Sequence, residues 1–108
     1  MRRAFLLLAV LGVFALPQSA QAQSFNCRFA RAADEIMICR DERLSRLDER
    51  MSSLFFRVRE DLGRRGARDL EEDQERFLRR RARCGPNPDC IEDVYRRRID
   101  ELRDYRRR

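Results

Sequence analysis

Residues 41–62, DERLSRLDERMSSLFFRVREDL, carry the clearest periodic pattern in the chain. Apolar residues recur there at steps of three and four, which is the spacing of one face of an α-helix. Asp41 stands ahead of them, where a carboxylate can accept hydrogen bonds from first-turn backbone N–H groups. The stretch therefore predicts a long amphipathic helix that Gly63 and Gly66 end in the left-handed conformation. Its buried face would comprise Leu44, Leu47, Met51, Leu54, Phe55, Val58 and Leu62.

Two shorter patterns flank this helix. Upstream, residues 32–39 have the length of about two helical turns. This segment would present Ile36, Met37 and Cys39 inward. Downstream, residues 67–83 form a third predicted helix with a thinner apolar stripe. Its inward side would comprise Leu70, Gln74, Phe77, Leu78 and Arg81.

A turn and a fourth helix complete the pattern. The segment 84–90, CGPNPDC, cannot stay helical because Pro86 and Pro88 lack N–H donors and restrict the residues before them. A helix then begins near residues 87–89, where either Asn87 or Asp89 could be the cap, and Asp89 and Glu92 have capping-box spacing. Its stripe would comprise Ile91, Val94, Tyr95, Ile99, Leu102 and Tyr105. The predicted fold is all-α, a small helical hairpin or bundle of three to four helices.

The first 22 residues read as a cleavable signal peptide. Arg2 and Arg3 precede an apolar stretch over residues 4–16, and Ala20-Gln21-Ala22 supplies the small-x-small cleavage pattern. A transmembrane anchor is the alternative, but 13 apolar residues span roughly 20 Å of a hydrocarbon core about 30 Å thick. Cleavage after Ala22 would leave residues 23–108 as a single helical domain, periplasmic or secreted.

The four cysteines, Cys27, Cys39, Cys84 and Cys90, are expected to form two disulfides, because an exported protein folds in an oxidising compartment. A zinc site is the alternative, but the cysteines lack the Cys-x-x-Cys knuckles typical of zinc. Four cysteines allow three pairings. Local pairing, Cys27 with Cys39 and Cys84 with Cys90, is favoured over crossed bridges, and each local loop would contribute roughly 2 to 3 kcal/mol.

The charge pattern has a structural explanation and a functional one. Signal removal leaves 23 basic and 19 acidic residues, a formal charge of +4. Acids at the start of the third helix and arginines at its end complement the helix macrodipole, which explains them as solvated helix faces. The same charges are the candidate partner-binding residues: Asp69, Glu71, Glu72, Asp73, Arg79, Arg80, Arg81 and Arg83.

Composition also argues against several functions. The chain has no His, so an oxidised cysteine set offers neither a base nor a nucleophile. So short a helical domain leaves little room for the deep cleft that paired catalytic carboxylates need. Nucleic-acid binding is disfavoured because few aromatic residues are present to stack on bases. The expectation is a non-enzymatic protein without a cofactor or metal.

Two sets of spaced residues resemble the lysozyme inhibitor LprI N-terminal domain family. The first set is Phe25-x-Cys27, Glu35-x-x-Ile38-Cys39 and Leu44-x-x-Leu47-Asp48. The second is Gln74-x-x-Phe77-Leu78-x-x-Arg81-x-x-Cys84 followed by Cys90-Ile91-x-x-x-Tyr95-x-x-Arg98-Ile99-x-x-Leu102. Phe77 departs from the Trp more usual in that family. Together the two sets span residues 25–102, and the resemblance implies an exported helical domain with paired cysteines.

The resemblance implies a lysozyme inhibitor that binds the enzyme and occludes its substrate cleft. Animal-type lysozymes are strongly cationic, so a partner of charge +4 would need a local acidic face. The acids around the turn at residues 63–66 are the candidate for that face. The alternative function is an envelope-binding module whose arginines, in residues 79–83, 96–98 and 106–108, contact anionic polymers or lipid headgroups.

Overall fold

The computed structural model describes residue 12 and residues 24–107. Apart from residue 12, the predicted signal peptide and its cleavage site lie outside the described residues. A short 3-10 helix, η2 (Cys27–Phe29), precedes four α-helices. These are α1 (Ala33–Arg40), α2 (Glu42–Asp61), α3 (Arg64–Arg83) and α4 (Pro88–Arg107).

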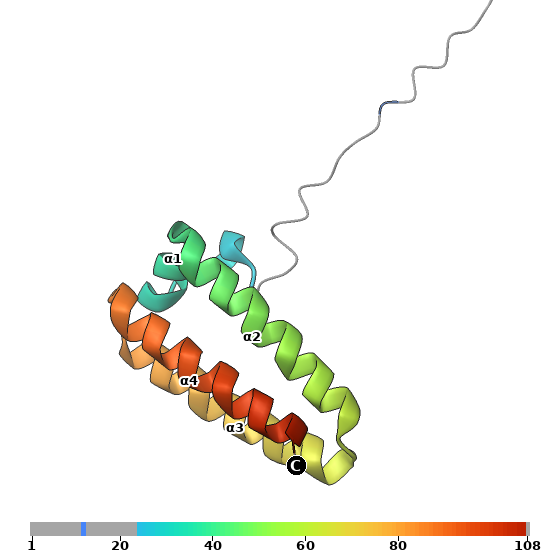
Figure 1. The fold of residues 1–108 in the computed structure, drawn as a ribbon. Coiled ribbons are helices and arrows are strands. Elements are labelled where there is room, and N and C mark those ends of the chain that lie inside the picture. The colour runs from blue at the N-terminus through green and yellow to red at the C-terminus, as the bar shows by residue number, and fades with distance from the viewer. Residues whose placement is uncertain (1–11, 13–23, 108) are drawn as a thin grey trace, which may run out of the picture.

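The three long helices pack into a bundle, and α1 lies at one end of it (Figure 1). α3 runs antiparallel to α2 and α4, while α2 and α4 run in the same direction and share the most extensive contact. α1 packs against the first half of α2 and the end of the bundle where α3 turns into α4. The predicted all-α bundle of three to four helices is confirmed.

Twelve apolar side chains form a continuous core between the helices. α2 contributes the predicted stripe, although Phe55 and Leu62 lie only partly buried at its margin. The rings of Phe77 and Tyr95 meet edge to face at 5.4 Å between centroids, which joins α3 to α4 at the centre. The core members are Ile38, Leu44, Leu47, Met51, Leu54, Val58, Leu70, Phe77, Ile91, Tyr95, Ile99 and Leu102.

The inward face of α1 differs from the prediction. Ile38 and Asp34 are the buried residues, whereas Ile36, Met37 and Cys39 are partly exposed. Residues 34 and 38 lie one turn apart on the same side of a helix, as residues four positions apart do. Met37 nevertheless packs against the core, as predicted. The prediction missed Asp34 because it chose inward residues by their apolar character.

The turn between α2 and α3 also differs from the prediction. α3 begins at Arg64, so Gly66 lies inside the helix and does not end α2. Gly63 has φ −68° and ψ 178°, an extended conformation, and Leu62 before it is extended as well. Two extended residues are enough to reverse the chain without a left-handed glycine. Among the described residues only Gly85, in the α3–α4 turn, has a positive φ, at 57°.

The starts of α2 and α4 follow from local capping. The Leu44 backbone N–H donates to Asp41 Oδ1 at 3.1 Å, which confirms the predicted N-cap. At α4 the Cys90 N–H donates to Asn87 Oδ1 at 3.1 Å, and Pro88 occupies the first helical position. Asn87 is therefore the cap, and Asp89 lies within the first turn.

Both disulfides form with the local pairing. Cys27 is bonded to Cys39 with Cα atoms 5.8 Å apart, and Cys84 to Cys90 with Cα atoms 5.5 Å apart. The first bond ties η2 to α1, and the second closes the α3–α4 turn. The elements that they join, η2 with α1 and α3 with α4 at their turn, lie at the same end of the bundle (Figure 1).

Candidate functional site

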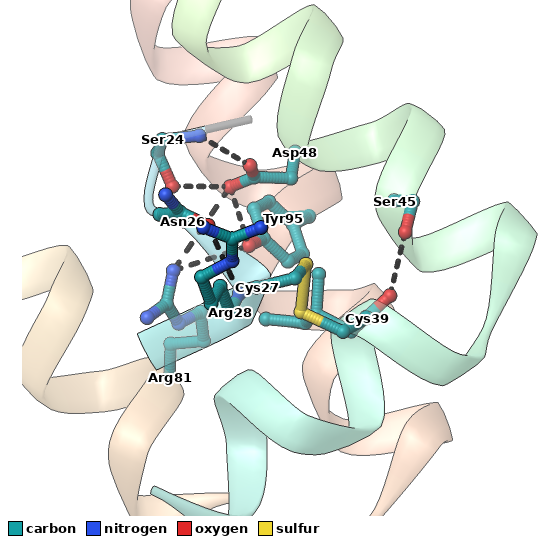
Figure 2. The surroundings of a disulfide bond; sticks show 10 residues. Ser24, Asn26, Cys27, Arg28, Cys39, Ser45, Asp48, Arg81 and Tyr95 are labelled. Atoms are coloured by element: carbon teal, nitrogen blue, oxygen red, sulfur yellow. Dashed lines mark hydrogen bonds and ion pairs between the residues drawn. A yellow bond between two sulfur atoms is a disulfide. The ribbon is translucent and has the colours of Figure 1, made fainter. Parts of the chain in front are cut away.

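The most unusual feature of the fold is a buried polar network that joins all four α-helices. Figure 2 shows three of its members, Asp48, Arg81 and Tyr95. Arg81 of α3 donates from Nε to Asp34 Oδ2 of α1 at 2.7 Å. Its Nη1 donates to the Tyr95 hydroxyl of α4 at 3.2 Å. That hydroxyl in turn donates to Asp48 Oδ1 of α2 at 2.8 Å. We call Asp34, Asp48, Arg81 and Tyr95 the buried network.

The N-terminal segment covers this network. The backbone N–H of Ser24 donates to Asp48 Oδ2 at 2.7 Å, and the Ser24 hydroxyl donates to Asp48 Oδ1 at 2.6 Å. The ring of Phe25 lies 5.1 Å from the Arg81 guanidinium carbon, a cation–π distance. The Cys27–Cys39 disulfide lies beside the same residues (Figure 2). The segment that begins at Ser24 is thus held by both a covalent bond and the network.

The electrostatics of the network keep Tyr95 neutral. Burial raises the pKa of the Tyr95 hydroxyl far above its ordinary value, and the negative charge of Asp48 raises it further. Burial lowers the pKa of Arg81, but Tyr95 and Asp34 more than offset it, so the pKa of this guanidinium is raised. A neutral hydroxyl between a guanidinium and a carboxylate can accept from one and donate to the other. The arrangement acts as a structural clamp.

A second buried polar contact lies further along the bundle. Arg98 of α4 is fully buried and donates from Nε to Gln74 Oε1 of α3 at 3.0 Å. Its Nη1 donates to Glu101 Oε2 at 3.0 Å, while Nη2 has no hydrogen-bond partner among the described residues. Gln74 also contacts the sulfur of Met51 in α2. This cluster again connects three helices through residues that the sequence places far apart.

The acidic residues predicted to bind a partner are split by their surroundings. Asp69, Glu71 and Glu72 are exposed on α3, and Glu71 pairs with Arg59 of α2 at 2.9 Å. Asp73 is partly buried and bonded to Tyr105 and Arg76. Burial would raise the pKa of Asp73, but these two donors lower it below its ordinary value. Only the first three acids are fully presented to solvent.

The four predicted arginines do not form one surface. Arg79 and Arg83 are exposed, and the guanidinium of Arg80 lies 3.8 Å from Glu101 of α4. Arg81 belongs to the buried network and is only 6% exposed. Arg81 lies on the inward side of α3, as the sequence predicted. Its guanidinium is therefore buried and cannot contribute to a charged surface.

Sequence reasoning missed Asp34 and Asp48 as structural residues. A signal was present, because Asp48 lies four residues after Leu44 and Asp34 four before Ile38, on faces that otherwise carry core residues. An acid on a core face is a sign of a buried partner. The identity of that partner is not encoded locally, because Asp34 and Arg81 are 47 residues apart.

The fold and the buried network define a small all-α protein stapled by two disulfides. Comparisons with models of known families, with curated proteins and with solved structures gave no match to this chain. Within residues 24–107, no helix is both long and apolar enough to cross a membrane. The same part of the chain contains no cluster of three or more His, Cys, Asp or Glu side chains that could hold a metal ion.

Proposed function

We propose that this protein is an exported, LprI-like inhibitor that binds lysozyme and blocks access to its substrate cleft. One observation carries the proposal. Three polar residues that give the resemblance, Asp48, Arg81 and Tyr95, belong to the buried network, and all four resembling cysteines form the disulfides. Many of the spaced residues therefore help to hold this fold together, which supports a shared fold with the family.

Export is part of the proposal. Two disulfides suit an oxidising compartment, which the periplasm or the cell exterior provides. Cleavage after Ala22 would place Gln23 and Ser24 at the start of the mature chain. Ser24 is the residue that donates twice to Asp48, so the new N-terminus would be anchored next to the network.

The surface best suited to a cationic enzyme lies around the α2–α3 turn. Exposed carboxylates come from both helices there. Four of them form no ion pair with another described residue: Glu60, Asp61, Asp69 and Glu72. An acidic group of this kind would steer a cationic partner and set its orientation more than it would add affinity. We propose that this face contacts the rim of the lysozyme cleft.

The proposal is tested by the turbidity of a bacterial suspension during lysis by lysozyme. Purified mature protein in excess is expected to slow the fall in turbidity, in proportion to the amount added. Unchanged lysis at every excess tested would contradict inhibition of the lysozyme used.

A pair of matched variants tests the proposed face. Asp69→Asn with Glu72→Gln removes two exposed acids near the α2–α3 turn, and the inhibition is expected to weaken severalfold. Asp89→Asn with Asp93→Asn removes two exposed acids at the opposite end of the bundle and is expected to inhibit normally. Equal inhibition by both variants would move the contact surface away from the α2–α3 turn.

A further inference from the structure

Arginines from two helices line a surface trough, and only Arg96 among them belongs to a predicted arginine cluster. Between α2 and α4 lies a hollow of about 340 Å³ lined by Arg43, Arg46, Arg50 and Arg96, with Glu42 and Leu47. A second hollow of about 140 Å³ shares Leu47, Arg50 and Arg96 and continues to Ile99 and Arg103. We call Arg43, Arg46, Arg50, Arg96 and Arg103 the arginine trough.

The trough is linear because its residues follow two helices that run side by side. Arg43 and Arg50 are seven residues apart on α2, as are Arg96 and Arg103 on α4, and seven residues advance about 10 Å along a helix. The side chains of Arg46 and Arg96 are 74% and 61% exposed, so their guanidinium groups are open to solvent. Leu47 and Ile99 lie between the two rows and supply an apolar floor.

Glu92 positions two of these arginines. The Glu92 carboxylate is largely buried, and its Oε1 accepts hydrogen bonds from Arg96 Nε and Nη2 at 3.1 and 2.8 Å. Its Oε2 lies 3.2 Å from Arg43 Nη2 of the neighbouring helix α2. Each guanidinium has five N–H donors, so both keep donors that are not used by Glu92. The pair is thereby held at the mouth of the trough with less side-chain freedom to lose on binding.

The trough keeps a positive charge after its ion pairs are counted. The five arginines have only three acids as ion-pair partners, Glu42, Glu92 and Asp100. Arg50 has no ion pair among the described residues. Exposed ion pairs contribute little and exchange readily, so an incoming anion can compete for Arg46 and Arg103. Guanidinium groups match phosphate and carboxylate oxygens in bidentate geometry.

We propose that the arginine trough binds a linear polyanion that carries phosphate or carboxylate groups along its length. A concave channel with charges repeated along two parallel rows fits an extended chain better than the flat surface of a bilayer. The proposed site goes beyond lysozyme inhibition and does not depend on it. The trough shares no residue with the acidic face proposed to contact lysozyme at the α2–α3 turn.

The test is isothermal titration of the mature protein with two defined probes, long-chain inorganic polyphosphate and poly-glutamate. Binding to at least one probe is expected, and it should weaken as salt rises because exposed charges are screened. Arg46→Gln with Arg50→Gln is expected to weaken it at least about tenfold, since charge-assisted hydrogen bonds are lost. The control, Arg79→Gln with Arg83→Gln, removes the same charge from exposed positions of α3 and is expected to stay within about twofold.

Each outcome bears on the trough separately from the inhibitor proposal. Loss of binding in the trough variant alone supports the site, and the more tightly bound probe identifies phosphate or carboxylate as its group. Equal losses in both variants, or no binding of either polymer by the wild type, would overturn it. Tighter binding to phosphatidylglycerol vesicles than to both polymers would overturn the choice of an extended chain. The trough variant is expected to inhibit lysozyme as the wild type does.

Discussion

Asp48 shows how a single residue organises this fold. Its carboxylate is fully buried, yet it accepts hydrogen bonds from Ser24 and Tyr95 and lies 4.0 Å from Arg81. A buried charge is costly unless it is paired and hydrogen-bonded, so the residues around Asp48 must be in place when the helices pack. An acid at this position therefore specifies which helix faces meet.

Replacing Asp48 by Asn tests that role with almost no change of shape. The variant removes the charge that faces Arg81 and one acceptor in the network, and it is expected to lower the free energy of unfolding by about 3 kcal/mol or more. Urea unfolding followed by helical circular dichroism measures the change. Asp100→Asn, at a side chain 76% exposed, is the control and should change it by less than about 0.5 kcal/mol. A similarly small effect at Asp48 would mean that the network does not stabilise the fold.

The helices differ in how well their own residues cap their N-termini. α2 has a side-chain cap from Asp41, and Asn87 caps the start of α4. α3 begins at Arg64, and its N-cap residue, Gly63, has no side chain that could cap the helix. The first turn of α3 contains no acidic residue. Positive charge near a helix N-terminus is unfavourable, so α3 depends on packing against the other helices more than on its own start.

Gly63→Ser is expected to stabilise the protein by about 0.5 kcal/mol. Serine supplies a capping oxygen and reduces the freedom of the unfolded chain, and nothing lies within 4 Å of a Cβ added there. Thermal unfolding measures the effect. Gly85→Ser is the contrasting variant, because a side chain at φ 57° is strained, and it should destabilise by about 1 kcal/mol. Destabilisation by Gly63→Ser would show that a cap is not what the start of α3 lacks.

At the scale of the molecule, the two ends of the bundle are held differently. Both disulfides and the buried network lie at the end that carries α1, whereas the α2–α3 turn has surface ion pairs such as Arg59 with Glu71. Through Asp48 and Arg81, Tyr95 connects α4 to α2 and α3, and Arg81 extends the connection to α1. Deprotonation of the Tyr95 hydroxyl should therefore disrupt the packing of all four helices and not of one helix alone.

Alkaline titration tests this coupling. Because the folded pKa of Tyr95 is raised above its ordinary value of 10.0, its contribution to stability is complete below that pH and is lost as pH rises above it. In a Tyr105→Phe background Tyr95 is the only tyrosine, so its ionisation can be followed by ultraviolet absorbance. Tyrosinate is expected to appear in the same transition in which helical circular dichroism disappears. Reversible ionisation with the helices intact would contradict the coupling.

The sequence by itself determined the helices, most of their buried faces and the local disulfides, because periodicity, proline positions and short cysteine separations act over a few neighbouring residues. The sequence pattern misplaced the inward face of α1, because a buried aspartate lies where an apolar residue was expected. It also misplaced the start of α3, because two extended residues, and not a left-handed glycine, form the turn before it. Only the tertiary structure decided the partners of Asp34, Asp48 and Arg81 and brought Arg43 and Arg96 to one trough. The reason is physical: a charged residue has the same local pattern whether it faces solvent or a partner, and its role depends on which helix faces meet.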